Sequence, residues 1–245
     1  MHSPNFAREY TLNRWLWHAL DWLYPPVCAA CSTPGYRLCN DCLKKVKIIN
    51  QQKVCPVCGI PQTEFRACDE CEGAPPAFTA VRSWGVYEDP LRSTIHRLKY
   101  KSDLGVSQDL AGQLSRLLSQ MSWSIDLVTP VPLSAERQRQ RGYNQASLLA
   151  RWVSLAKKIR CETKALIRVK DTTSQVGLTG PERRRNVSGA FKAEPRVVDG
   201  KSILVIDDVA TTGATMQACA IALIGAGAAR VYGLTLARAG HIHLS

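Results

Sequence analysis

One short segment constrains the fold more than any other part of the chain. Residues Ser202–Met216 read SILVIDDVATTGATM, an apolar run followed by two adjacent aspartates and then by threonines around a glycine. A continuous apolar run is typical of a parallel strand that is buried on both faces. Helices must cover those faces, so the segment predicts an α/β fold with a parallel sheet flanked by helices. Ligands of such sheets bind beyond the carboxyl ends of the strands, where we place Asp207 and Asp208.

The residues after the aspartates suit a phosphate group. We expect the next helix to begin near Thr215, and the first amides of a helix are unpaired and carry the positive end of its dipole. Gly213 lets the backbone approach a ligand closely. The predicted phosphate cradle consists of Ala210, Thr211, Thr212, Gly213, Ala214 and Thr215. Beside this cradle, Asp207 and Asp208 can accept hydrogen bonds from sugar hydroxyls, so the segment predicts a sugar phosphate as ligand. An ordinary capped strand–turn–helix requires fewer acids and threonines than are present.

Strand-like and helix-like patterns alternate through the rest of the C-terminal part. Strand patterns occupy residues 78–89, 125–132, 163–169, 202–208 and 230–238. Helical patterns occupy residues 90–100, 105–121, 143–159 and 215–228. This alternation supports the parallel sheet, because each parallel connection needs a crossover helix.

The charge of the chain points to polyanionic partners. The formal net charge is +12, and residues 134–192 hold fourteen Lys or Arg against four Asp or Glu. Such a balance favours nucleic acid, phosphate or anionic membrane as partner over a neutral one. Arg137, Arg139 and Arg141, between a predicted strand and a predicted helix, could clasp a diphosphate through bidentate hydrogen bonds. For these arginines a solvated basic face remains the alternative.

Eight of the ten cysteines form a metal-binding pattern. They occur as four C-x-x-C pairs before residue 72, namely Cys28, Cys31, Cys39, Cys42, Cys55, Cys58, Cys68 and Cys71. Four thiolates from two such pairs suit tetrahedral structural zinc and close its coordination shell, which argues against catalytic zinc. We therefore expect one or two structural zinc ions. The spacing leaves open whether consecutive pairs share an ion or whether the pairs cross.

Thiolates stay available to a metal in a reducing compartment, so we expect a cytoplasmic protein. No secretory signal peptide and no apolar run long enough for a transmembrane segment is apparent. Residues 10–24 have the pattern of an amphipathic helix, and three tryptophans are interleaved in it. Packing against the rest of the protein is the simpler interpretation of this helix, and contact with a membrane surface or a partner is the alternative.

The segment Ile203–Thr215 resembles the 5-phosphoribosyl 1-diphosphate (PRPP) loop of type I phosphoribosyltransferases. This resemblance implies that Asp207 and Asp208 hold the ribose hydroxyls, that Ala210 to Thr215 hold the 5′-phosphate, and that Mg²⁺ accompanies PRPP. Residues 130–146, with the three arginines, resemble the diphosphate-binding loop of that family. Residues 172–191 resemble its flexible loop, in which Arg183, Arg184 and Arg185 would meet the diphosphate.

The order of these parts resembles the ComF/GntX family of competence and DNA-utilisation proteins. The resemblance implies an N-terminal helix at residues 1–26, a double zinc ribbon at 27–72 and a phosphoribosyltransferase-like domain at 78–245. It further implies handling of incoming single-stranded DNA in the cytoplasm, with DNA-import machinery at the inner membrane as a possible partner. Lys99 and Lys101 of the LKYKSD stretch, together with Tyr143, would add to a DNA-binding or phosphate-binding surface.

Two hypotheses of different class follow. In the first, the protein is a binding protein that keeps a PRPP site and works on single-stranded DNA. In the second, it is an active Mg-dependent phosphoribosyltransferase with an unidentified acceptor. The sequence singles out no catalytic residue and no acceptor pocket, so the acceptor and the retention of catalysis stay open.

Overall fold

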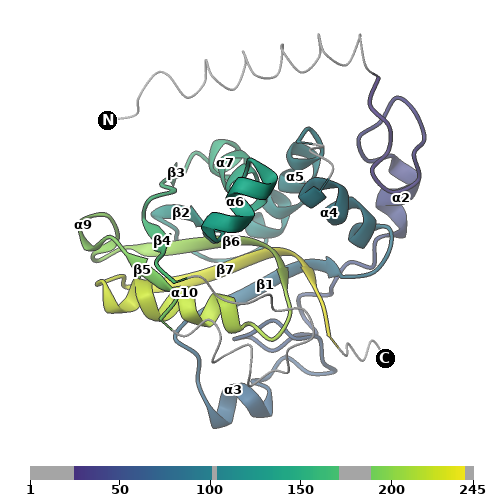
Figure 1. The fold of residues 1–245 in the computed structure, drawn as a ribbon. Coiled ribbons are helices and arrows are strands. Elements are labelled where there is room, and N and C mark those ends of the chain that lie inside the picture. Colours follow the sequence, from purple (N-terminus) through teal and green to yellow (C-terminus); the bar gives the residue numbers. More distant parts are fainter. Residues whose placement is uncertain (1–24, 101–103, 171–188, 241–245) are drawn as a thin grey trace.

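The computed structural model describes residues 25–100, 104–170 and 189–240 (Figure 1). Three of the sequence-based expectations fall outside these ranges. They are the amphipathic helix at residues 10–24, the cationic side chain of Lys101, and the arginines Arg183, Arg184 and Arg185. Of the helices in the described ranges, none has the length and apolar content of a membrane span.

A five-stranded sheet in the order β1-β7-β6-β2-β3 forms the centre of the fold, and all of its strand pairs are parallel. The strands are β1 (Ala80–Val86), β2 (Leu127–Pro130), β3 (Arg160–Cys161), β6 (Ser202–Ala210) and β7 (Arg230–Arg238). The prediction of a parallel α/β sheet is confirmed. Apolar residues dominate its inner strands because helices cover both of their faces.

Helices α4 (Leu91–Tyr100), α5 (Val106–Ser119) and α7 (Gln145–Lys157) lie over one face of the sheet, and α10 (Ala214–Gly225) lies over the other (Figure 1). The short helices are α2 (Asn40–Lys45), α3 (Asp69–Gly73), α6 (Ala135–Arg141) and α9 (Pro195–Val198). A separate antiparallel pair, β4 (Leu166–Arg168) and β5 (Phe191–Ala193), packs beside α10. The short strand expected at residues 163–169 thus exists, but it pairs outside the main sheet.

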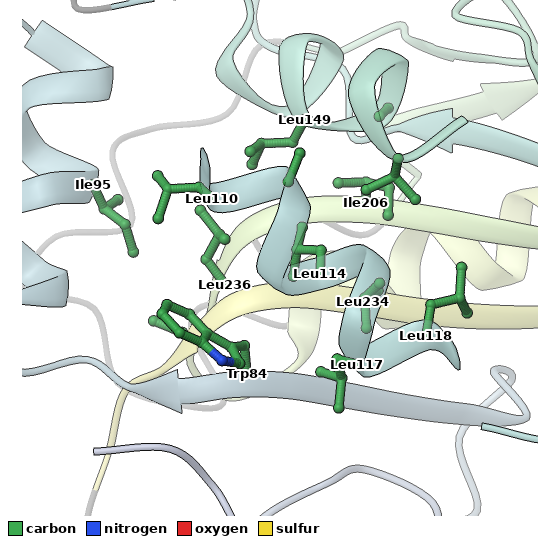
Figure 2. Packing of buried hydrophobic residues seen from close by; sticks show 14 of the residues in the cluster. Trp84, Ile95, Leu110, Leu114, Leu117, Leu118, Leu149, Ile206, Leu234 and Leu236 are labelled. Atoms are coloured by element: carbon green, nitrogen blue, oxygen red, sulfur yellow. The ribbon is translucent and has the colours of Figure 1, made fainter. Parts of the chain in front are cut away.

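The side chains on the two faces of β6 pack into two separate hydrophobic cores. Leu204 and Ile206 pack with α4, α5 and α7, whereas Ile203 and Val205 pack with α10. This division follows from the side-chain period of two along a strand. Figure 2 shows the larger core, in which residues of α5 such as Leu114 interlock with the sheet.

The cysteine module consists of two ribbons with the same local geometry. In the first, the amide of Ser32 donates to the carbonyl of Cys28, and in the second the amide of Gly59 donates to that of Cys55. Both Ser32 and Gly59 adopt the left-handed conformation, with φ of 63° and 72°. The duplicated C-x-x-C pairs of the sequence therefore fold as duplicated turns.

These ribbons lie on opposite faces of the sheet, and its edge strand β1 lies between them. Ala29 and Val46 of the first ribbon pack into the core of α4 and α5, while Val57 of the second packs into the core of α10. In Figure 1, α2 lies above the sheet and α3 below it. The chain between the ribbons pairs with β1, for example through the amide of Ile49 and the carbonyl of Trp84 at 3.0 Å. The module thereby covers an edge that would otherwise expose unpaired backbone groups.

Gly59 marks the point where the second ribbon meets β1. A Cβ atom at this position would lie 2.3 Å from the carbonyl oxygen of Val81. Conformation alone does not demand glycine here, because Ser32 adopts the same backbone region in the first ribbon. The close approach to the strand demands it.

We expect Gly59→Ala to destabilise the zinc-loaded protein more than Gly35→Ala does. Gly35 also has a positive φ, of 86°, but nothing lies within 4 Å of its hypothetical Cβ. Both substitutions add left-handed strain of about 1–2 kcal/mol, and only Gly59→Ala adds a backbone clash, for which we expect at least about 1 kcal/mol more. Urea unfolding of both variants measures the difference. Equal losses would show that the ribbon does not press against β1.

Candidate functional site

The chain reverses its direction across the sheet between β2 and β6. These two strands are neighbours, but α7 leads from β2 outward to β3, whereas α10 leads from β6 outward to β7. The two helices leave from opposite faces. A crevice opens beyond the carboxyl ends of strands at such a switch point, and this is where α/β sheets bind ligands. The predicted sugar-phosphate residues, from Asp207 onward, lie at this end of β6.

The two aspartates lie within β6, which continues to Ala210 instead of ending at the aspartates. Asp208 is buried, and its Oδ2 lies 2.7 Å from Nζ of Lys99. Beyond this ion pair, that oxygen has no hydrogen-bond partner among the described residues. It is therefore an acceptor that a ligand could claim.

Lys99 lies inside this site. Its side chain is 19% exposed, and it reaches Asp208 from the last turn of α4. The nearby carboxylates of Asp208 and Asp207 raise the pKa of Lys99 against the opposing effect of burial, so the ammonium stays charged. The first lysine of the basic LKYKSD stretch thus forms an ion pair with an aspartate at the switch point of the sheet.

Asp207 has a different electrostatic environment. Burial, followed by the adjacent carboxylate of Asp208, raises the pKa of Asp207 to about 8. Its Oδ1 accepts a hydrogen bond of 2.8 Å from the backbone amide of Asp208. A shift in this direction means that the site without a ligand favours the neutral acid, and that a cation or a set of hydroxyl donors would favour the carboxylate.

The loop after β6 ends at the N-terminus of a helix. Helix α10 begins at Ala214, one residue before the predicted start, and Gly213 is its N-cap with φ of 77°. Glycine contributes no capping side chain, and the hydroxyl of Thr212 accepts from the amide of Ala214 at 3.4 Å. The positive end of the helix dipole favours an anion at this position. Nothing lies within 4 Å of a hypothetical Cβ on Gly213, which leaves space above the turn.

The three arginines that follow β2 lie on the short helix α6. Residues four apart share a helix face, so Arg137 and Arg141 lie together while Arg139 points to the opposite side. Arg137 and Arg141 are half-buried, and Arg139 is exposed. The helix is fixed at its start by the hydroxyl of Ser134, which accepts from the amide of Arg137.

The last turn of α4 ties these parts together. The hydroxyl of Tyr143 donates to the carbonyl of Leu98, and the guanidinium of Arg141 lies 4.8 Å from the ring centre of Tyr100. Lys99, which lies between Leu98 and Tyr100 in the sequence, forms an ion pair with Asp208. Three consecutive residues therefore contact β6, α6 and the turn that leads into α7.

The cysteines form two groups, each from four consecutive cysteines of the module. One holds Cys28, Cys31, Cys39 and Cys42, and the other holds Cys55, Cys58, Cys68 and Cys71; within each group the sulfur atoms lie within 4.8 Å of one another. The structure thus selects consecutive pairing over the crossed arrangement.

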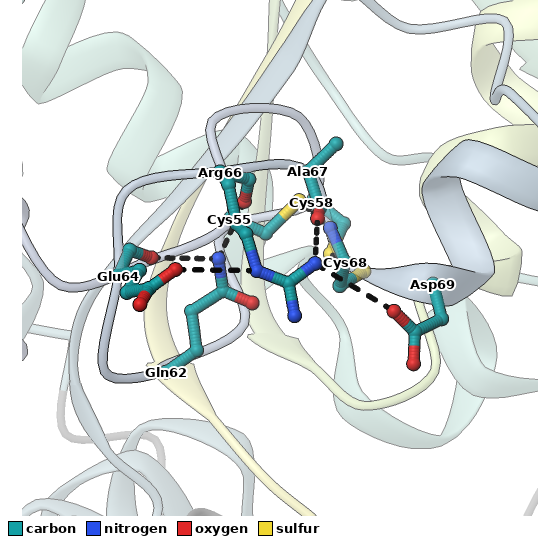
Figure 3. Close-up of polar contacts among 8 residues, drawn as sticks. All are labelled: Cys55, Cys58, Gln62, Glu64, Arg66, Ala67, Cys68 and Asp69. Carbon is teal, nitrogen blue, oxygen red and sulfur yellow. Dashed lines mark hydrogen bonds and ion pairs between the residues drawn. The ribbon is translucent and has the colours of Figure 1, made fainter.

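Both groups fit zinc. A tetrahedron with Zn–S bonds of 2.3 Å places sulfurs about 3.8 Å apart, and the Sγ atoms of Cys31 and Cys39 are 3.6 Å apart while those of Cys58 and Cys68 are 3.7 Å apart. Backbone amides also point at the sulfurs, as when the amide of Cys68 donates to Sγ of Cys55. Figure 3 shows Cys55, Cys58 and Cys68 of the second group and the polar contacts around them.

Comparison with known proteins identifies the two parts of the chain. Residues 19–72 match the model of a double zinc ribbon domain, and residues 149–242 match that of a phosphoribosyl transferase domain. DNA utilization protein YhgH of Escherichia coli O6:H1 is 31% identical over 84% of this chain and 94% of its own length. The chain belongs to the ComF/GntX family.

Other relatives of this ComF/GntX protein carry competence names. Competence protein ComFC of Bacillus subtilis is 32% identical over 84% of this chain and 85% of its own. Competence protein F of Haemophilus influenzae is 30% identical over 74% of this chain and 81% of its own.

Sequence reasoning missed the contacts of Arg82 and Arg238. Both arginines are buried, at 6% and 5% exposure, and both donate to carbonyls of the second zinc turn. A signal was present in the sequence, because Arg82 interrupts the apolar strand AVRSWGV. A charge within a fully buried strand needs a partner.

We expect Lys99→Met to lower the free energy of unfolding by about 2–4 kcal/mol, because it leaves the buried Asp208 carboxylate unpaired. Lys99→Met combined with Asp208→Asn should recover more than half of this loss. Lys47→Met is the matched control: Lys47 pairs with Glu88, and both side chains are more than half exposed, so we expect a loss below about 1 kcal/mol. Urea unfolding of these three variants, of Asp208→Asn alone and of wild type tests the pair. Additive losses for Lys99 and Asp208 would contradict it.

Proposed function

We propose that this ComF/GntX protein binds PRPP, or a closely related sugar phosphate, beyond the carboxyl ends of β2 and β6. One observation carries the proposal. At the switch point of the sheet, two aspartates precede a helix whose N-cap, Gly213, has no capping side chain. The positive end of a helix dipole suits a phosphate, and carboxylate oxygens suit a sugar diol.

Each part of the ligand has a suitable partner. The 5′-phosphate would bind the amides and hydroxyls of residues 210–215, and the ribose hydroxyls would bind Asp207 and Asp208. The diphosphate would meet Arg137 and Arg141, which share one face of α6, in preference to Arg139. Mg²⁺ bound with the diphosphate would neutralise part of its charge. In the same proposal, Arg183, Arg184 and Arg185 belong to a loop that closes over the site and contacts the diphosphate.

Lys99 would compete with the ligand for the carboxylate of Asp208. In the structure its ammonium holds the buried Oδ2 of Asp208. A ribose hydroxyl that donates to the same oxygen must share it with Lys99 or replace the ion pair. We therefore propose that ligand binding rearranges the end of α4, and that this rearrangement reaches Arg141 through Tyr100.

The family places this site in the context of DNA utilisation and competence. We propose that the protein works in the cytoplasm, where the thiolates of its zinc ribbons stay reduced. There the PRPP-type site would serve a protein that handles incoming DNA, rather than an isolated nucleotide-synthesis enzyme. DNA-import machinery at the inner membrane is the partner that such a role implies.

Calorimetry of PRPP with Mg²⁺ tests the site. We expect wild type to bind, and Asp207→Asn combined with Asp208→Asn to lose at least about tenfold in affinity, since two acceptors for the diol become amides. Asp199→Asn, a change in the loop after α9 where Asp199 is the C-cap, serves as the control and should bind as wild type does. Full affinity in the double variant would refute the ribose assignment, and no binding to wild type would refute the proposed function.

Single-stranded DNA is a second candidate ligand, and a specific surface feature favours it. Tyr100 is 61% exposed, and the guanidinium of Arg141 lies over its ring. An exposed aromatic ring beside a cation is the combination that stacks a base and holds its phosphate. Tyr143 is half-buried with its hydroxyl engaged, so it supports α4 in this arrangement instead of offering a free ring.

We expect the affinity for oligothymidine to fall steeply with salt, with a slope of roughly −2 or steeper in a plot of log K against log salt, because several phosphates are contacted. Tyr100→Ala should weaken binding by about tenfold, the loss of one stacked base. Tyr36→Ala removes a similarly exposed ring, at 53%, from the first ribbon and serves as the control. Fluorescence anisotropy measures both effects. A flat salt response, or equal effects of the two substitutions, would exclude the Tyr100 surface.

A further inference from the structure

The second zinc turn rests entirely on the phosphoribosyltransferase sheet. Three successive carbonyls of this turn accept hydrogen bonds from the sheet. The side chain of Arg82 donates to Pro56 at 3.0 Å, the amide of Val81 donates to Val57 at 2.8 Å, and the side chain of Arg238 donates to Cys58 at 2.9 Å.

Arg82 and Arg238 are unusual because both are buried without an acidic partner. Their exposures are 6% and 5%, and neither forms an ion pair with a carboxylate in the part of the chain that the structure describes. Nε of Arg82 is also buried without a hydrogen-bond partner. Burying a guanidinium is costly unless an opposite charge lies nearby.

A zinc ion held by four thiolates in the second cysteine group would form a cluster of the opposite charge. Four thiolates around one Zn²⁺ leave two excess negative charges, which match the two arginines in number. We infer that Arg82 and Arg238 are the counter-charges of the second zinc site, so that this site and the sheet form one electrically neutral unit. The inference does not depend on the proposed PRPP site.

The first ribbon is built differently. Its turn receives one arginine bond from the sheet domain, from Arg97 to the carbonyl of Cys28 at 3.2 Å, and Cys31 is exposed to solvent. Water can solvate a charged cluster at that position. Substitution of Arg82 or Arg238 should therefore change the release rate of the second zinc ion and not that of the first.

Zinc transfer from the full-length protein to a chromophoric chelator tests the inference. We expect one of the two zinc equivalents to leave about tenfold faster, or more, in Arg82→Met and in Arg238→Met, with the other equivalent unchanged, because each variant leaves the cluster with an uncompensated charge. Arg66→Met is the matched control. Arg66 belongs to the same ribbon but is exposed and pairs with Glu64 and Asp69 (Figure 3), so its release rates should equal those of wild type.

A second variant separates charge from hydrogen bonding and covers the case in which Arg82→Met folds poorly. Cys68→His gives a Cys₃His site, which carries one negative charge less. Alone it should speed zinc release, because both arginines then exceed the remaining charge. Combined with Arg82→Met it should slow release, and restore any lost folding, relative to Arg82→Met alone. If Cys68→His and Arg82→Met accelerate zinc release additively in the combined variant, the charge assignment is overturned. It is also overturned if Arg82→Met and Arg238→Met release zinc at the wild-type rate.

Discussion

The contact between the zinc module and strand β1 is the interaction on which the rest of the structure depends. An edge strand exposes unpaired backbone groups, and β1 would be such an edge. The chain between the ribbons pairs with it, and the turn that contains Gly59 presses against the backbone of Val81. Zinc folds the ribbons, and the ribbons complete the sheet, so the metal-binding part is a structural component of the phosphoribosyltransferase-like fold.

Both ribbons are also connected to the candidate site by short routes. Helix α4 contacts the first ribbon through Arg97 and reaches Asp208 two residues later through Lys99. On the other side, Arg238 contacts the second ribbon and pairs in register with Ala210, the first residue of the phosphate loop. The loop that would hold a phosphate thus begins beside a residue fixed by a zinc turn. Loss of either metal would loosen an element that positions the site.

The sequence predicted those features that depend on local patterns. The continuous apolar run of β6 predicted a parallel sheet, and the spacing of the cysteines predicted metal turns. It could not predict contacts between distant segments. Lys99 looked like part of a basic surface because nothing local shows that α4 ends against Asp208. The arginines of α6 looked equivalent until the helix separated Arg139 from the other two, and consecutive zinc pairing was undecided because spacing alone allows both arrangements.

The electrostatics of the site explain how a fold can carry two adjacent aspartates in its interior. Two carboxylates in one buried place repel each other, and each loses hydration. In the structure, Lys99 neutralises Asp208, and the raised pKa of Asp207 favours its protonated form. The site is thus close to neutral before any ligand arrives. The proposed sugar-phosphate ligand would donate hydroxyl groups to these carboxylates and would therefore favour the ionised form of Asp207. We expect its affinity to rise with pH as Asp207 loses its proton, because the pKa of Asp207 is raised to about 8.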